Sequence, residues 1–335
     1  MPTSRDIRSL PSRTPELAKA LVTGAAGFVG QWLCRALLRR GWTVTGTTIG
    51  MAPSPGILDP AELMSMHWRG MDLRPGVDRR TLAGLLDRER PDAIFHLAAI
   101  AFVPAASDDP MRALDTNVSA AVRLVEAMRA HKVAGTADPT LLVIGSAEQY
   151  GAQEGPAPLR EETDQRPRTF YAATKCAQEA FALAAARADG VRVVATRSFN
   201  HSGRGQGPSF LLPSLVRRAR EAGPTAPLAI GNAGTVRDFL HVEDVVSAYI
   251  SLVERGRPGE AYNVCSGEGI TVGDAAAEVL ARAGVDAEVV SDPALRRTVD
   301  VPWLVGDNTK LRTDTGWAPT RSRADIIDDL LNATP

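Results

Sequence analysis

The sequence has few cysteines, almost no net charge and no long apolar run. Its three cysteines, Cys34, Cys176 and Cys265, are scattered and lack metal-ligand spacing, so we expect reduced thiols in a cytoplasmic protein. Lysine and arginine number 38 and aspartate and glutamate 39, which leaves a net charge of −1. This balance gives no electrostatic basis for binding nucleic acid or an anionic membrane. The apolar stretches are far too short to span a bilayer.

Residues 1–16 lack the apolar core of a secretory signal. Their sequence, MPTSRDIRSLPSRTPE, is polar, and its arginine and serine content resembles a transit peptide. Asp6, Glu16 and the internal prolines argue against that interpretation. We therefore expect a flexible leader, with the folded part beginning near residue 17.

The rest of the chain has the length and composition of a folded enzyme. With 335 residues and 44% hydrophobic content, it can bury one large core and a smaller lobe. Apolar runs alternate with amphipathic stretches, which predicts parallel βαβ units. The predicted strands are Ala20–Thr23, Thr43–Thr48, Ala93–Leu97, Leu141–Ile144 and Val191–Thr196, and the predicted helices are Val29–Arg40, Thr81–Arg90, Pro110–His131 and Tyr171–Arg187. After Phe199, glycine- and proline-rich segments indicate the loops of a substrate-binding lobe.

Three side chains are placed for proton transfer. Tyr171 and Lys175 stand in YAATK, so a helix would present both on one face. An ammonium near a phenol stabilises the phenolate, and we expect it to lower the pKa of Tyr171. Such a tyrosine can exchange a proton with an alcohol or carbonyl oxygen near neutral pH. Ser146 ends a strand in LLVIGSAEQYG, where ligands of parallel sheets lie, and it can hydrogen-bond the same oxygen.

A glycine-rich turn lies near the start of the chain. The segment GAAGFVG, residues 24–30, follows an apolar strand and opens a helical pattern. Glycines permit a tight turn and a close approach of the backbone to a pyrophosphate at the helix N-terminus. The spacing is GxxGxxG rather than GxGxxG, and a βα turn without a ligand is the alternative. The context predicts a dinucleotide site on Gly24, Gly27 and Gly30.

Taken together, these motifs resemble the extended short-chain dehydrogenase/reductase superfamily, in the branch that acts on nucleotide sugars. The resemblance runs from about Leu17 to the C-terminal helix, and HLAA (His96–Ala99) and TNV (Thr116–Val118) are similar to further family motifs. It implies an α/β fold with a Rossmann-type doubly wound parallel sheet over residues 17–198. It also implies a smaller C-terminal α/β substrate-binding lobe over residues 199–335, interleaved with strands that return to the sheet. A homodimer would form through the helices that start near Pro110 and Tyr171.

The resemblance also assigns roles to individual residues. Lys175 would reach the nicotinamide ribose, and Asp72 and Leu73 would contact the adenine. The implied cofactor-binding residues are Gly24, Ala26, Gly27, Phe28, Val29, Gly30, Thr48, Asp72, Leu73, Leu97, Ala98, Ala99, Asn117, Tyr171 and Lys175. No metal ligand is implied.

We expect the cofactor to be NADPH/NADP. A carboxylate at the end of the second strand would accept the 2′-hydroxyl of NAD and repel a 2′-phosphate. That strand reads VTGTTI, residues 44–49, without an acid, and a hydroxyl such as that of Thr48 could hold a phosphate. No arginine follows closely, so NAD(H) stays an alternative.

Segments of the second half resemble GDP-mannose-type enzymes. RSFNHSGRGQ, residues 197–206, has Arg204 in place of the usual proline, and GNAGTVRDFLHVEDVV would place Arg237 near a diphosphate. The segment RTVDVP, residues 297–302, resembles RPxEVP, with Thr298 and Asp300 as departures. The implied substrate-binding residues are Asn200, Arg237, Arg297 and Asp300. A guanidinium fork suits phosphate oxygens, and a surface ion pair is the alternative for either arginine.

Glu148 bears on the type of reaction. In the 4,6-dehydratases that GSAEQYG resembles, the glutamate acts on the proton at C5, but a carboxylate there can also bind sugar hydroxyls. Residues 207–213 lack the arginine-rich loop of those dehydratases and resemble the shorter form of the reductases. We therefore expect Ser146, Tyr171, Lys175 and Glu148 to be the catalytic set of an NADPH-dependent 4-ketoreductase.

The expected substrate is a GDP-linked 4-keto-6-deoxy hexose, and the product is GDP-D-rhamnose or its C4 epimer. A GDP-mannose 4,6-dehydratase or a nucleotide-sugar 4-epimerase is the alternative within this class. A non-catalytic NADP(H) sensor on the same fold is the alternative outside it.

Overall fold

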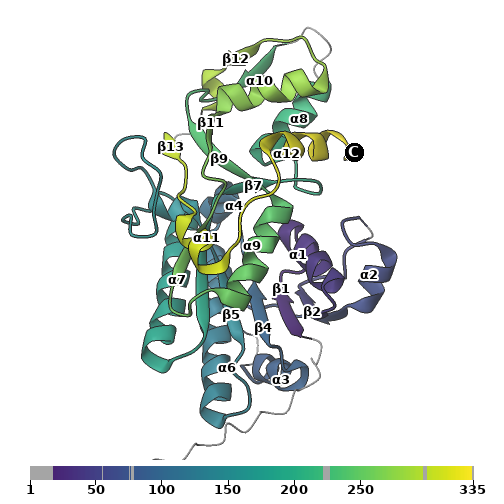
Figure 1. Ribbon diagram of the computed structural model, residues 1–335, viewed down its shortest axis with the longest axis vertical. Coiled ribbons are helices and arrows are strands. Elements are labelled where there is room, and N and C mark those ends of the chain that lie inside the picture. Colours follow the sequence, from purple (N-terminus) through teal and green to yellow (C-terminus); the bar gives the residue numbers. More distant parts are fainter. Residues whose placement is uncertain are drawn as a thin grey trace, which may run out of the picture.

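The computed structural model describes residues 18–54, 56–74, 76, 79–221, 227–296 and 300–333. The leader predicted for residues 1–16 lies outside this part of the chain. Figure 1 shows a larger part, called the main layer here, in which helices flank a central sheet, and a smaller lobe above it. Within the described residues, no helix combines the length and the apolarity that crossing a bilayer requires.

Seven parallel strands form the main sheet, in the order β10-β6-β5-β4-β1-β2-β3. Their bounds are β1 (Lys19–Thr23), β2 (Thr43–Thr48), β3 (His67–Gly70), β4 (Ala93–His96), β5 (Thr140–Ser146), β6 (Val193–Ser198) and β10 (Ala261–Val264). The chain runs from β1 to one edge and then returns to β4, beside β1, before it continues to the other edge. This reversal opens a crevice at the carboxyl ends of β1 and β4, where ligands of such sheets bind. The predicted Rossmann-type sheet is confirmed.

Helices cover both faces of the main sheet. One face carries α3 (Arg79–Glu89), α6 (Ala120–Ala134) and α7 (Phe170–Asp189), and the other carries α1 (Phe28–Arg39), α9 (Val242–Arg255) and α11 (Thr309–Thr315). Successive residues of a strand enter different cores, because side chains alternate across a sheet. Leu21 and Ile94 pack with the first set of helices, and Val22 and Phe95 with the second. Burial on both faces explains why these strands are continuous apolar runs.

The long helix predicted over Pro110–His131 contains a π-helical turn. It is divided into α5 (Pro110–Leu114), the π turn η1 (Asp115–Ser119) and α6, which ends at Gly135 in the left-handed region. Such turns inside α-helices are frequent at functional sites. Here the turn carries Asn117, which is fully buried and faces α7.

The second lobe is built from segments that follow β6. Its strands are β7 (Asn200–Ser202), β8 (Leu228–Ile230), β9 (Val236–His241), β11 (Gly269–Thr271), β12 (Val289–Ser291) and β13 (Trp303–Leu304), and its helices are α8 (Leu211–Glu221), α10 (Val272–Ala283), the 3-10 turn η3 (Pro293–Leu295) and α12 (Arg323–Leu331). Three of these helices enclose a separate apolar core around Leu215, Leu280 and Ile327. Because α9, β10 and α11 lie in the larger layer, the chain crosses between the layers several times after residue 199 (Figure 1).

Candidate active site

A single cavity of about 660 Å³ extends from the glycine-rich turn into the second lobe. It is lined by fourteen of the residues predicted to form the site: Gly24, Gly27, Phe28, Val29, Gly30, Leu97, Ala99, Ser146, Glu148, Tyr171, Lys175, Asn200, Arg237 and Asp300. Residues distant in sequence thus converge on one space. The cavity has three parts: the glycine turn, the catalytic end around Ser146, Tyr171 and Lys175, and the lobe end around Arg237 and Asp300.

The glycine turn is shaped for close approach of a ligand. Gly24 has a φ of +68°, in the left-handed region that favours glycine, and a Cβ there would lie 2.9 Å from the amide nitrogen of Ala98. A Cβ on Gly30 would collide with the carbonyl of Gly24. Gly27 forms the N-cap of α1 without a capping side chain, and the first residues of the helix line the cavity. These features fit the pyrophosphate of a dinucleotide.

The catalytic end brings together the three side chains predicted for proton transfer. Tyr171 and Lys175 lie on α7 and Ser146 ends β5, and each is less than a tenth exposed. The Ser146 hydroxyl accepts from the Glu148 amide at 3.2 Å, and it lies close enough to the Tyr171 phenol to influence its pKa. The Lys175 ammonium donates to the carbonyl of Ile144 at 2.8 Å and to Gln178 at 3.0 Å. All three side chains border the cavity beyond the glycine turn.

The expected effect of Lys175 on Tyr171 is wrong in this structure. Burial raises the pKa of Tyr171 to about 12, the nearby Ser146 hydroxyl offsets part of this rise, and the charge of Glu148 adds to it. Burial also lowers the pKa of Lys175 to about 7. The ammonium is bonded to a backbone carbonyl and an amide rather than to the phenol. Burial therefore outweighs any stabilisation of the phenolate.

Two residues predicted to contact the cofactor lie behind the cavity wall. The Ala98 amide donates to Thr23 at 3.1 Å, which ties the end of β4 to the end of β1. The Asn117 side chain accepts from the Ile100 amide at 2.8 Å and donates to Thr174 at 3.0 Å. Both contacts hold the segment after β4 in place beside α7.

Four other predicted cofactor residues lie outside the cavity lining. Ala26 belongs to the glycine turn, and its carbonyl accepts from Gln31 at 3.1 Å. Thr48 ends β2, and Asp72 and Leu73 follow β3, at the same edge of the sheet. Arg74 binds the Asp72 carboxylate through two nitrogens, and these contacts lower the pKa of Asp72. An adenine contact by Asp72 would share this carboxylate with Arg74.

At the lobe end, two predicted substrate residues form an ion pair. Arg237 donates to Asp300 at 2.6 Å and to the carbonyl of Val301 at 2.7 Å. Asn200 pairs with Phe239 where β7 meets β9, and its side chain also borders the cavity. Arg297 lies outside the described residues.

Sequence reasoning missed several cavity residues. Phe102 and Phe210 meet edge to face at 5.9 Å across the space between the two layers, and His201 stacks on Phe28 at 6.4 Å. Arg218 lies on the face of α8 that borders the cavity, and it donates to the carbonyl of Ala229. The helical spacing of Leu211, Ser214, Leu215 and Arg218 is a signal that could have found this face.

The fold and this arrangement define an NAD(P)-dependent oxidoreductase of the extended short-chain dehydrogenase/reductase type. The family model described as GDP-mannose 4,6 dehydratase matches residues 21–330, and the chain belongs to this family.

Curated relatives and solved structures agree with this assignment. The chain is 34% identical over 305 residues to the GDP-6-deoxy-D-mannose reductase of Pseudomonas aeruginosa, covering 90% of this chain and 92% of that protein. It is 28% identical over 314 residues to GDP-mannose 4,6 dehydratase 2 of Arabidopsis thaliana, covering 90% of this chain and 82% of that protein. The structure of RMD from P. aeruginosa complexed with NADPH superposes with a TM-score of 0.75 at 31% identity, covering 94% of this chain and 97% of that one. The resemblance stated from the sequence is thereby confirmed.

Proposed function

We propose that the protein reduces the C4 keto group of GDP-4-keto-6-deoxy-D-mannose with NADPH, giving GDP-D-rhamnose or its C4 epimer. The observation that carries this proposal is that Ser146, Tyr171 and Lys175 line one cavity together with the glycine turn and the Arg237–Asp300 pair. A cofactor and a nucleotide sugar could therefore meet at the same phenol.

The reduction transfers one hydride and one proton. The glycine turn would hold the pyrophosphate of the cofactor and Lys175 its nicotinamide ribose, and the bound cofactor supplies the hydride that forms the bond to C4. Tyr171 donates its phenolic proton to O4 while Ser146 donates a hydrogen bond to the same oxygen. Because burial raises the pKa of Tyr171 to about 12, the phenol is protonated near neutral pH and holds the proton to be donated.

The lobe end supports a nucleoside diphosphate as the other part of the substrate. One face of α8 borders the cavity from Leu211 to Arg218, about 10 Å along the helix axis. Within the described residues, Arg237 donates to Asp300 and to the Val301 carbonyl, and Arg218 is paired with no carboxylate. We propose that Arg237 positions the diphosphate and that Arg218 lies near the base. The GDP-linked substrates named for the relatives make guanine our choice of base.

NADPH is the preferred cofactor in this proposal. The end of β2 presents Thr47 and Thr48 and no carboxylate that would repel a 2′-phosphate. The solved relative with 31% identity was determined with NADPH. NAD(H) is the alternative, and a comparison of kcat/KM with the two cofactors distinguishes them.

We also propose a homodimer that acts in the cytoplasm. Exposed apolar side chains gather on α5 and at the exposed positions of α7: Met111, Leu114, Phe170 and Phe181. These are the helices through which the resemblance implies dimerisation. Sedimentation equilibrium of the wild type and of Phe181→Asp tests this part.

A GDP-mannose 4,6-dehydratase is the second candidate, and the position of Glu148 favours it. Its carboxylate borders the cavity and is close enough to Tyr171 to raise the pKa of the phenol. A carboxylate there could remove the proton at C5 of a 4-keto sugar. Glu148→Gln separates the candidates, because a dehydratase should lose about 10²- to 10⁴-fold in kcat and a reductase about tenfold or less.

The primary test mixes the purified protein with GDP-4-keto-6-deoxy-D-mannose and NADPH and follows the absorbance of the reduced nicotinamide. Stoichiometric loss of absorbance supports the reductase, and NMR of the product then gives the C4 configuration. Conversion of GDP-mannose to a 4-keto sugar without added reductant would instead identify the protein as a dehydratase. No reaction in either assay would exclude both of these GDP-sugar activities.

A further inference from the structure

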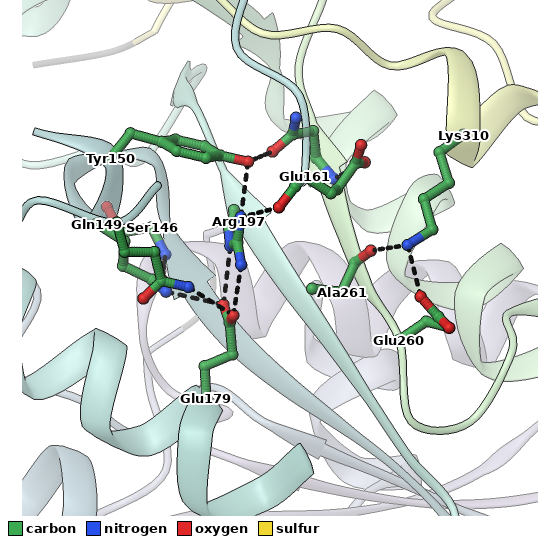
Figure 2. Close-up of polar contacts among 11 residues, drawn as sticks. Ser146, Gln149, Tyr150, Glu161, Glu179, Arg197, Glu260, Ala261 and Lys310 are labelled. Atoms are coloured by element: carbon green, nitrogen blue, oxygen red, sulfur yellow. Dashed lines mark hydrogen bonds and ion pairs between the residues drawn. The ribbon is translucent and has the colours of Figure 1, made fainter. Parts of the chain in front are cut away.

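A buried glutamine connects Ser146 to the helix that carries Tyr171. Gln149, in the 3-10 turn η2 (Ala147–Tyr150), accepts from the Ser146 amide at 2.7 Å through its side-chain oxygen. Its side-chain nitrogen donates to Glu179 of α7 at 2.8 Å, as Figure 2 shows. Gln149 is fully buried and Glu179 is 5% exposed. Both the oxygen and the nitrogen of the Gln149 side-chain amide are therefore hydrogen-bonded within the protein, away from solvent.

Glu179 is itself held by an arginine on the neighbouring strand. Arg197 of β6 donates to both carboxylate oxygens, at 2.7 and 3.0 Å, and its remaining nitrogen donates to Tyr150 at 3.1 Å and to the Glu161 carbonyl at 2.8 Å (Figure 2). Such a two-point pair fixes geometry as well as charge. Arg197 thus anchors the Glu179 carboxylate to the sheet, and the carboxylate in turn anchors Gln149.

The spacing along α7 relates Glu179 to the catalytic pair. Tyr171, Lys175 and Glu179 follow one another at intervals of one helical turn and are all buried, so they lie on one face. Ser146 is thereby linked to the helix that carries Tyr171. Its amide is linked through Gln149 to Glu179, and its hydroxyl lies close enough to Tyr171 to influence the pKa of the phenol.

The orientation of the Gln149 amide is fixed by its partners. A carboxylate accepts only, so the amide nitrogen must face Glu179, and a backbone N–H donates only, so the amide oxygen must face Ser146. Gly145 provides the room, since a Cβ there would collide with the Gln149 side-chain oxygen and with the Thr196 carbonyl. No other residue type at position 145 would leave this space.

We propose that Gln149, anchored by Glu179 and Arg197, is a positioning residue that holds the Ser146 hydroxyl against Tyr171 for the reaction. The effect on kcat rests on the proposed function, whereas the effect on the Ser146–Tyr171 contact does not. A misplacement of about 1 Å at a reacting group can cost on the order of 10²-fold in rate. Losing the link should therefore lower kcat and leave the KM for the nucleotide sugar nearly unchanged.

The chain offers a matched control for this proposal. Gln165 donates to the same Glu179 carboxylate at 2.7 Å but makes no contact with Ser146. Gln149→Met and Gln165→Met each remove one side-chain hydrogen bond to Glu179. Only Gln149→Met also removes the hydrogen bond to the Ser146 amide. A purely structural role predicts similar effects of the two changes, and a positioning role predicts different ones.

The first measurement does not require a substrate. The protein is labelled with 3-fluorotyrosine, and the ¹⁹F resonance of Tyr171 is assigned among the four tyrosines with Tyr171→Phe. The resonance should move in Gln149→Met in the same direction as in Ser146→Ala, and stay in place in Gln165→Met. An unmoved resonance in Gln149→Met would overturn the proposal, even if no GDP-sugar proved to be a substrate.

The second measurement uses the reductase assay. We expect kcat to fall about 10- to 100-fold in Gln149→Met and less than about threefold in Gln165→Met, with little change of KM in either. Equal losses of kcat in the two variants would mean that the network has only a structural role, and the positioning proposal would be wrong. If Gln149→Met does not fold, both measurements can be made on Gln149→Asn, whose side chain keeps the amide but is one methylene shorter.

Discussion

The two ends of the cavity are built differently. At the catalytic end, Ser146, Tyr171 and Lys175 lie on regular elements of the main layer and are nearly inaccessible to solvent. At the lobe end, Arg218 has one backbone partner and Asp300 lies in a connecting segment before β13. The reacting groups are thus fixed by β5 and α7 of the main layer, whereas the groups that would select the substrate lie on the second lobe. We expect changes at the first end to affect kcat, and changes at the second to affect KM.

The largest effect is expected from Tyr171→Phe. It removes the proton donor, so kcat should fall by about 10³-fold while NADPH binding, followed by fluorescence titration, stays within a fewfold of wild type. Tyr249→Phe is the matched control, because that hydroxyl is also buried at the cavity but bonds to Ser198 at 2.8 Å. It should keep most of the activity. An active Tyr171→Phe enzyme would contradict the mechanism.

Lys175→Met should reveal the free-energy cost of the charge buried at the catalytic end. Burial lowers the pKa of Lys175 to about 7 in the folded protein, from 10.5. Between these values the unfolded chain binds more protons, so this group stabilises the fold progressively as pH rises from 7 to 10.5. Below pH 7 the cost is fully expressed, on the order of 5 kcal/mol. The variant lacks this dependence.

The measurement is chemical denaturation of cofactor-free wild type and Lys175→Met at pH 6, 8 and 10. The difference in free energy of unfolding should favour the variant most at pH 6 and decline toward pH 10, because the other titrating groups are common to both proteins. The lost bonds to Ile144 and Gln178 add an offset. A difference that does not vary with pH would show that the lysine is not desolvated in this way.

The main layer could be predicted well because its signals are local. Strands buried on both faces are apolar runs, and the five predicted strands agree with β1, β2, β4, β5 and β6 within two residues at each end. The fourfold spacing of Tyr171 and Lys175 predicts a shared helix face, and the structure has both on α7. Parallel strands end at one edge, which brings Ser146 to the same place.

What could not be predicted depends on tertiary contacts. Spacing alone does not reveal burial, so the direction of the Tyr171 pKa shift was predicted wrongly. The ion pair of Arg237 with Asp300 joins residues 63 positions apart, and no local pattern links them. The π turn at Asn117 lies where that side chain contacts both the segment after β4 and α7, and helical propensity does not contain this information.

The smallest effects are expected from the arginines of the lobe end, which sharpen the contrast with Tyr171. Arg237→Met should raise the KM for the GDP-sugar about 10- to 100-fold, because a buried charge-assisted contact to phosphate is worth more than an exposed one. Arg218→Met should raise it about three- to tenfold, because its side chain is less buried. In both variants kcat should stay within a fewfold of wild type. A kcat loss of 10²-fold without a change in KM would mean that Arg237 acts on the reacting end, and the separation between the two ends of the cavity would then fail.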